Sequence, residues 1–502
     1  MRRSAFAVVA PVAVMVSIVV AGCGGGESAS DRASESVVPD VATTDSVADV
    51  ATSVASDSDT TPETNAPLTV PSEPDLENPD AVPPARDSVH LIDTPGSDVI
   101  LGVAARDDGR VWLSGHTDNA FLPELGGNSA GQLDALLVLY DAQAETSYPT
   151  FGQFGTPEAD AFLGVATTPD GGAVAVGYSK GEFASANYGI NDIIAVSVDA
   201  EGRERWRVQL GGPDWDRGYS VVANPDGSVY LGGYTFGGMA ENFGSTGAGG
   251  HDAVVAKVSA EGEIEWVRSI GTDDVDWGQS MASDGEGGVV MVGYTQGSWA
   301  ADNAGARDYF VARISAEGET VWTHQGGTDV DDWLQGVTVR DDGSIVGVGF
   351  TAGALGYASG GTDILLVHVS GDGELLGVKQ LGTAGDDRAF GVLQHESGEL
   401  IISGTVSGAW GVDSVWSDGK KDVFVAGLDE TLDLRWVSQF GSYDGADDDG
   451  YGIAMAGRLL WFVGVTAGDI GGSPVSGATD GWVTSYPCSG EAASCGFLSL
   501  GD

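Results

Sequence analysis

The chain has 502 residues, of which 74 are acidic and 22 basic, so its formal net charge at pH 7 is −52. This excess of acid argues against nucleic acid as a partner and is typical of proteins that stay soluble at high salt or that gather divalent cations. The apolar fraction is 42%. The 78 glycines, about twice the average usage, favour a fold rich in tight turns over one built from long helices.

The N-terminus has the pattern of an export signal. Arg2 and Arg3 precede an apolar stretch over residues 5–20, which is too short for a membrane span. Small residues then lead into Cys23, an arrangement that resembles the lipobox of bacterial lipoproteins. We therefore expect a signal peptide over residues 1–22 and a lipid on the Cys23 thiol that anchors the exported chain to a membrane, outside the cytoplasm. The alternative is a plain signal peptide with an incidental cysteine.

Residues 23–87 lack the apolar pattern of a folded segment. They consist largely of Ser, Asp, Thr, Ala, Glu and Pro, and they contain no aromatic residue. Such a composition cannot bury enough apolar surface to offset the entropy of folding. We expect a disordered tether here, between the anchor and a folded part.

The folded part, residues 88–487, is a sevenfold repeat. An aspartate that opens an apolar strand recurs at intervals of 55 to 60 residues. These seven residues are Asp134, Asp192, Asp252, Asp308, Asp363, Asp422 and Asp480. The interval matches one four-stranded blade of a β-propeller. The predicted fold is therefore all-β, a seven-bladed β-propeller of four-stranded antiparallel blades.

The third repeat shows how a blade is built. Its predicted strands cover residues 219–223, 228–234, 253–259 and 264–270. The first and last connections are tight turns at Asp226-Gly227 and Glu261-Gly262, where a hairpin requires glycine for its positive φ. The connection between the second and third strands is longer in every repeat. Because the long loops gather on one face of the disc, we expect binding groups on that face.

A signature follows from comparing the repeats. Second strands end in Gly-Tyr-Thr or a close variant, and we interpret the fourth-strand tryptophans as inter-blade packing residues. These tryptophans are Trp206, Trp266, Trp322 and Trp436. With the strand over residues 308–314 and its Glu317-Gly318 turn, the pattern resembles the SBBP-type β-propeller repeat of bacterial proteins, over residues 90–487. That resemblance implies seven blades and an exported or surface location, but no single activity.

The two ends of the repeat array complement each other. The seventh blade reaches Pro487 without a fourth strand, and residues 88–93, just ahead of the first blade, have a strand-like pattern. We predict that this N-terminal segment completes the last blade and removes the open edge of the array. In the C-terminal tail, residues 488–502, an exported compartment favours a disulfide between Cys488 and Cys495.

A second aspartate precedes each first strand and is a candidate metal ligand. The seven residues are Asp98, Asp160, Asp216, Asp276, Asp332, Asp387 and Asp448. Clustered carboxylates near one mouth of the axial channel would suit a cation such as Ca²⁺. The alternative is that each aspartate accepts backbone N–H groups at its inter-blade turn.

Aromatic residues in the long loops are candidate ligand-binding residues. Phe121, Trp299, Trp410 and Trp416 lie in connections between second and third strands. Such side chains can stack on a sugar ring or anchor a protein partner. The alternative is that each one holds its loop against its own blade.

No catalytic motif accompanies this pattern. The six histidines are scattered over different repeat positions, and no HExxH, GxSxG or P-loop motif occurs. We expect a monomeric, surface-anchored, extracytoplasmic binding or scaffold module that engages a protein or a glycan through its long-loop face. The alternative is a polysaccharide hydrolase or lyase that uses the clustered carboxylates of that face.

Overall fold

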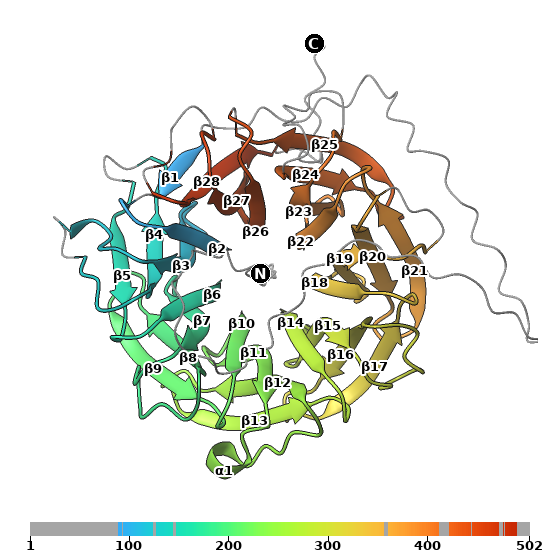
Figure 1. The fold of residues 1–502 in the computed structure, drawn as a ribbon, viewed down its shortest axis with the longest axis horizontal. Helices are drawn as coiled ribbons and strands as arrows, with labels where there is room; N and C mark the ends of the chain where they lie inside the picture. The colour runs from blue at the N-terminus through green and yellow to red at the C-terminus, as the bar shows by residue number, and fades with distance from the viewer. Residues whose placement is uncertain are drawn as a thin grey trace, which may run out of the picture. The chain divides into compact units, whose positions relative to one another are not determined.

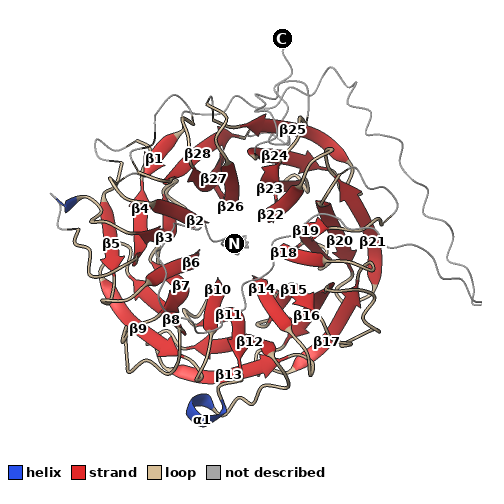
Figure 2. Ribbon diagram, viewed as in Figure 1, coloured by secondary structure: helices blue, strands red, loops and turns tan. Residues whose placement is uncertain are grey.

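The computed structural model describes residues 89–92, 94–123, 127–143, 147–355, 360–410, 421–442, 444–470, 475 and 477–488. Within these ranges, 28 strands form seven four-stranded antiparallel sheets, which confirms the predicted fold class (Figure 2). The predicted signal peptide, the tether, Cys23, Cys495 and Trp416 lie outside the described residues. No helix in the described part is long and apolar enough to cross a bilayer.

Each blade begins with an inner strand whose first residue is one of the candidate metal aspartates. The inner strands are β2 (Asp98–Ala105), β6 (Asp160–Thr167), β10 (Asp216–Ala223), β14 (Asp276–Ser283), β18 (Asp332–Val339), β22 (Asp387–Gln394) and β26 (Asp448–Ala456). The second strands are β3 (Val111–Thr117), β7 (Ala173–Ser179), β11 (Val229–Phe236), β15 (Val289–Thr295), β19 (Ile345–Thr351), β23 (Leu400–Val406) and β27 (Leu459–Thr466).

The third strands are almost wholly buried and the outer strands are partly exposed. The third strands are β4 (Asp134–Tyr140), β8 (Asp192–Val198), β12 (His251–Val258), β16 (Asp308–Ile314), β20 (Asp363–Val369), β24 (Asp422–Leu428) and β28 (Asp480–Pro487). The outer strands are β5 (Thr150–Phe154), β9 (Glu204–Leu210), β13 (Ile264–Ile270), β17 (Thr320–Gly326), β21 (Leu375–Leu381), β25 (Leu434–Phe440) and β1 (His90–Ile92). A short helix, α1 (Ala240–Phe243), lies in the long loop of the third blade.

The seven inner strands surround a common axis (Figure 1). Each inner strand contacts the next around the circle, and β26 contacts β2, so the ring is closed. Glycines allow the blades to approach closely. A Cβ added to Gly164 would lie 2.5 Å from the Tyr219 carbonyl oxygen, and one added to Gly336 would lie 2.5 Å from that of Phe390. Both carbonyls belong to the next blade, so no larger residue fits at these positions.

The predicted tight turns are present, and each contains a glycine in the left-handed backbone conformation. In the third blade Gly227 has φ +86° and Gly262 has φ +89°. Their N–H groups donate to the carbonyl oxygens of Asn224 and Ser259, so each glycine is the left-handed residue at the end of a three-residue hairpin loop. The predicted strands of this blade match β10 to β13, although β10 starts three residues earlier, at Asp216. The difference arises because Asp216 and Arg217 pair with the end of β11, which the sequence pattern does not reveal.

The ring is closed by pairing the two ends of the array. Strand β1 pairs with β28 in the order β1-β28-β27-β26, so the N-terminal strand is the outer strand of the seventh blade. Ile92 is fully buried and Val89 is 7% exposed, and both belong to the core of the ring. This confirms the predicted closure, with a shorter strand than the six residues expected.

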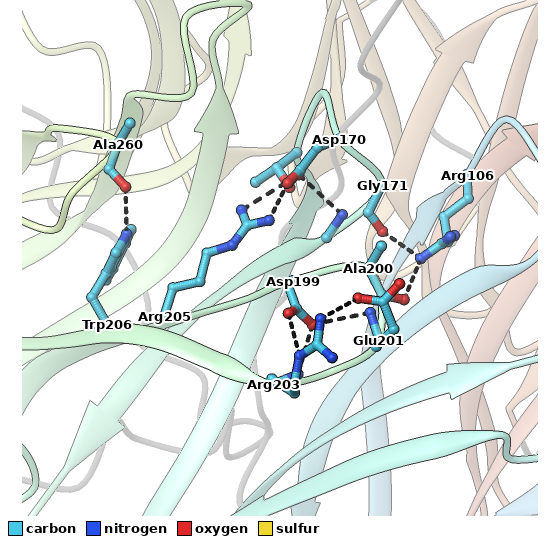
Figure 3. A network of polar contacts seen from close by, with 12 residues as sticks. Arg106, Asp170, Gly171, Asp199, Ala200, Glu201, Arg203, Arg205, Trp206 and Ala260 are labelled. Atoms are coloured by element: carbon cyan, nitrogen blue, oxygen red, sulfur yellow. Dashed lines mark hydrogen bonds and ion pairs between the residues drawn. The ribbon is translucent and has the colours of Figure 1, made fainter.

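Side chains on the short-turn side fasten one blade to the next (Figure 3). The Trp206 indole N–H donates to the Ala260 carbonyl oxygen at 3.0 Å, and Trp322 donates to Gly371 at 3.0 Å. Both carbonyls lie in the following blade, which agrees with the interpretation of these tryptophans as inter-blade residues. Trp436 differs, since its indole N–H donates to a glutamate of its own blade.

An arginine makes the same kind of connection between the first two blades. Arg106 donates to the carbonyl oxygens of Gly171 and Ala200, both in the second blade (Figure 3). Asp108 forms an ion pair with Arg106 at 2.9 Å and so holds the guanidinium in place. Arg106, Trp206 and Trp322 thus have structural roles on the short-turn face.

Candidate functional site

The aspartates that open the inner strands hold the inter-blade turns. All seven are 0% exposed, and a carboxylate oxygen of each accepts a backbone N–H from the turn before it. At Asp332, for example, Oδ2 accepts the Thr328 N–H at 2.6 Å and the Thr328 hydroxyl at 2.8 Å. Burial raises the pKa of Asp216 to about 7, and the pKa values of Asp387 and Asp448 to about 6.

These contacts assign the ring of aspartates a structural role. Within the described ranges, no group of three or more His, Cys, Asp or Glu side chains is arranged to hold a metal ion. Calcium binding by Asp98, Asp160, Asp216, Asp276, Asp332, Asp387 and Asp448 stays a prediction, to which their geometry adds no support.

The aspartates that open the third strands are held by a glutamine clamp. In five blades, the side-chain amide of an outer-strand glutamine donates to this aspartate and to a long-loop carbonyl, while its Oε1 accepts a long-loop N–H. The clamp residues are Gln153, Gln209, Gln325, Gln380 and Gln439. These residues were not predicted from the sequence. A signal for them exists, because in four blades the glutamine follows its aspartate by 17 residues.

The clamp also explains the loop aromatics. The N–H groups of Phe121, Trp299 and Trp410 donate to the clamp oxygen at 3.0, 2.7 and 2.7 Å. Phe121 is 1% exposed, Trp410 is 5% exposed, and the ring of Trp299 lies 5.0 Å from that of Phe310 in its own blade. Phe121 and Trp410 are buried in their blades, whereas Trp299 is partly buried and packs against the core of its blade. Ligand binding by these residues stays a prediction.

One position of the repeat departs from regularity. The residue that follows the aspartate on each inner strand is partly exposed in six of the seven blades, whereas its neighbours are buried. The residues at this position are Val99, Ala161, Arg217, Trp277, Trp333, Arg388 and Asp449. The fourth position of the inner strand also varies, but it is buried in every blade, so the partly exposed second position is where a variable side chain can meet a ligand.

The third to fifth blades carry a continuous band of aromatic rings around the tryptophans at this position, formed by residues of the inner and second strands near their long-loop end. We name it the axial belt. Its members are Tyr219, Tyr234, Trp277, Tyr294, Trp333 and Phe350. Trp277 lies 3.9 Å from Tyr234 and stacks on Tyr294 at 5.9 Å with an interplanar angle of 16°. Trp333 lies 4.7 Å from Tyr294.

Arginines flank the axial belt at both ends. The Arg217 guanidinium lies 4.7 Å from the centre of the Tyr178 ring and 5.4 Å from that of Trp215. At the other end, the Arg388 guanidinium lies 4.4 Å from the centre of the Phe350 ring. Burial lowers the pKa of Arg388, but an arginine stays charged at neutral pH.

Several polar atoms around the axial belt have no hydrogen-bond partner among the described residues. They include Nε of Arg217, Nε1 of Trp333, Oε1 of Gln335 and Nε2 of Gln279. Gln279 and Gln335 are 0% and 1% exposed, and both are on the inner strands of blades that carry the belt tryptophans. Buried polar groups are normally hydrogen-bonded, but unpaired buried atoms occur in the other blades as well, so those of the belt do not by themselves mark a binding site.

A recess is present at the outer rim of the first blade. An open cavity of about 590 Å³ in the first blade is lined by residues that include Tyr148, Phe151 and Gln153. Gln153 already serves the clamp of this blade. Elsewhere, Cys488 is buried and disulfide-bonded, while its predicted partner Cys495 lies outside the described residues.

Comparison with known proteins leaves the function open. No protein-family model matches the chain, and no curated protein matches it. Solved structures that resemble it include a puromycin hydrolase complexed with PGG (16% identity, 74% of this chain and 52% of the other, TM-score 0.41). A second is an α-L-arabinanase of Penicillium chrysogenum complexed with arabinobiose (14% identity, 80% of this chain and 99% of the other, TM-score 0.39). A third is a DUF4221 family member of Bacteroides vulgatus (10% identity, 81% of this chain and 98% of the other, TM-score 0.33). At these TM-scores the resemblances support no argument, and the architecture rests on the seven sheets themselves.

Proposed function

We propose that the chain is a binding module that engages a glycan at the axial belt, and that the lipid expected on Cys23 displays it outside the cytoplasm. The observation that supports this is the aromatic band that spans three blades, with Trp277 and Trp333 partly exposed at the axis. Aromatic faces bind the apolar faces of sugar rings, and nearby amide and guanidinium groups hydrogen-bond sugar hydroxyls.

The shape of the belt favours a slender ligand over a folded partner. A stable protein interface buries about 800 Å² on each partner. The belt lies near the long-loop ends of the inner strands in three neighbouring blades. An oligosaccharide can enter such a place more readily than a folded domain.

The ion pairs near the belt do not favour catalysis. Asp331 lies 3.3 Å from Arg307, and Asp449 lies 3.4 Å from Lys421. Carboxylates engaged in this way are poor candidates for the acid and nucleophile of a glycosidase. The alternative of a polysaccharide hydrolase or lyase stays a prediction.

A glycan array probed with the full chain tests the proposal, followed by calorimetric titration of the best oligosaccharide. We expect Trp277→Ala and Trp333→Ala each to lower the affinity about 30-fold, the loss of about 2 kcal/mol expected for a central aromatic contact. Trp266→Ala, on the outer strand β13, is the matched control and should bind as the unsubstituted chain does. Absence of glycan binding, or equal losses in all three variants, would refute the proposal.

A further inference from the structure

The few basic residues of this chain are mostly paired with acids. Of the arginines in the described ranges, eight form ion pairs with Asp or Glu. The other five are Arg217, Arg268, Arg340, Arg388 and Arg458. Two of these five, Arg217 and Arg388, occupy the same repeat position at the two ends of the axial belt. In a chain of net charge −52, arginines without an acidic partner at one site require an explanation.

Arg217 is the better placed of the two to bind an anion. Its guanidinium is only partly exposed, and the groups that act on it most strongly are the phenols of Tyr219, Tyr234 and Tyr178, which are neutral at pH 7. Arg388, by contrast, has Asp386, Asp449 and Asp331 within electrostatic range. Removing a cation from water without a counter-charge is unfavourable, and contacts with aromatic rings compensate for only part of it.

From these observations we propose that the glycan is acidic and that Arg217 binds one of its carboxylates, an inference that rests on the proposed function. A guanidinium presents paired N–H donors that match the two oxygens of a carboxylate. The Nε of Arg217 is buried and has no hydrogen-bond partner among the described residues, while the two terminal amino groups of the guanidinium carry four further N–H donors for a carboxylate. Trp277 and Trp333 stand between Arg217 and Arg388 around the axis, so the arrangement suits sugars stacked on the belt with carboxylates along the chain, as in a polyuronate.

The net charge of the protein does not rule out this ligand. At physiological ionic strength the field of an exposed charge is screened over about 8 Å, so distant surface carboxylates contribute little at the belt. The groups that a bound carboxylate meets are local, and those that act most strongly on Arg217 are the phenols of Tyr219, Tyr234 and Tyr178. The neighbouring Asp216 is buried, and burial raises its pKa to about 7. Specificity for the acid is therefore set by Arg217, and affinity for the sugar by the tryptophans.

Calorimetric titration of the full chain with three matched oligomers tests the inference. The oligomers are a galacturonate oligomer, the same oligomer with its carboxyls methyl-esterified, and a sulfated galactan oligomer. We expect the galacturonate oligomer to bind most tightly. Arg217→Met should weaken its binding roughly 10- to 100-fold, the range for a lost charged hydrogen bond, and leave the ester unaffected. The affinity of Arg217→Lys for the galacturonate oligomer should lie between those of the unsubstituted chain and Arg217→Met, because lysine keeps the charge and loses the paired donors.

Arg268→Met is the matched control, since Arg268 also lies over an aromatic ring, that of Trp266 at 5.5 Å, but on the outer strand β13. Thermal unfolding of each variant establishes that it is folded. Equal binding of ester and acid, equal effects of Arg217→Met and Arg268→Met, or tighter binding of the sulfated oligomer would each overturn the assignment. The proposed function is tested separately by the loss of glycan affinity in Trp277→Ala. It fails if no oligomer and no array glycan binds through the belt.

Discussion

The residues repeated in every blade of this protein are structural, and the aspartates show why. A carboxylate that accepts N–H groups from a turn fixes the direction in which the chain crosses to the next blade. Because each of these carboxylates is buried, ionisation is opposed by the loss of hydration. Their regular hydrogen bonds offset part of that cost, and the balance makes the stability of the fold sensitive to pH.

Asp216 is expected to make the protein more stable as the pH falls from 7 to 5. Burial raises the pKa of Asp216 from 3.8 to about 7. Between these values the folded chain binds a proton that the unfolded chain has released, so stability falls as the pH rises, by up to about 1.4 kcal/mol per pH unit, and levels off above about pH 7. Denaturant unfolding at pH 5, 6, 7 and 8 measures this, and Asp216→Asn should flatten the curve.

Asp170→Asn is the control for this pH series. Arginine and backbone hydrogen bonds outweigh partial burial and lower the pKa of Asp170 to about 2, so its titration falls below the window measured. The control should therefore run parallel to the unsubstituted chain. Parallel curves for Asp216→Asn as well would show that Asp216 does not carry the effect.

The clamp glutamines should contribute more to stability than any exposed polar residue. Gln209 donates to Asp192 at 2.7 Å and accepts the N–H groups of Phe183 and Ala184 at 2.8 and 3.0 Å. Gln209→Leu leaves these buried groups unpaired, and we expect a loss of about 3 kcal/mol in denaturant unfolding. Gln143→Leu, at an exposed position, should change stability by no more than about 0.5 kcal/mol. Similar losses in both variants would contradict the role given to the clamp.

At the scale of elements, the shortest strand has the largest effect on the architecture. Strand β1 has three residues, and its register pairs are His90 with Val483, Leu91 with Trp482, and Ile92 with Gly481. Without it β28 would be an open edge, and the seventh blade would lack its outer strand.

Deletion of residues 87–95 is therefore expected to lower the melting temperature sharply and to broaden the transition, as measured by differential scanning calorimetry. The physical reason is the loss of Val89 and Ile92 from the core together with the closing pairs. Deletion of residues 30–38 instead, within the tether predicted from sequence, is the length-matched control and should leave the melting temperature unchanged. An unaltered transition after the first deletion would show that β1 is dispensable for closure.

For the whole molecule, charge is the dominant property. A net charge of −52 produces repulsion across the surface, which salt screens. We expect the melting temperature at pH 7 to rise by several degrees between about 0.05 and 1 M NaCl, where the screening length falls from above 10 Å to about 3 Å. At pH 5, nearer the isoelectric point of about 4.1, the rise should be smaller. A melting temperature that falls with salt at pH 7 would contradict this.

The periodic features of the sequence predicted the fold because each reflects one local requirement. Glycine at positions such as Gly227 marks a hairpin, and an aspartate such as Asp308 marks the start of a third strand. The axial belt was not predicted, because Trp277 and Trp333 read as ordinary strand residues in separate repeats. Their proximity, 6.1 Å between ring centres, depends on how neighbouring blades pack, which no single repeat encodes. Likewise, the sequence does not show that the backbone N–H groups of the loop aromatics are bound by the clamp glutamines, which hold these loops against their blades.

The clasp formed by β1 has a mechanical consequence. A pull applied at Val89 reaches β28 through three residue pairs and the first blade through the Tyr148 hydroxyl, which donates to the Leu91 carbonyl oxygen at 2.9 Å, whereas β27 and β28 are joined by eight pairs. Tension on the N-terminal side therefore detaches β1 first, and it does so before any other blade bears load. A propeller held from this end would respond to stretching by opening at this one seam, with the other six blades intact.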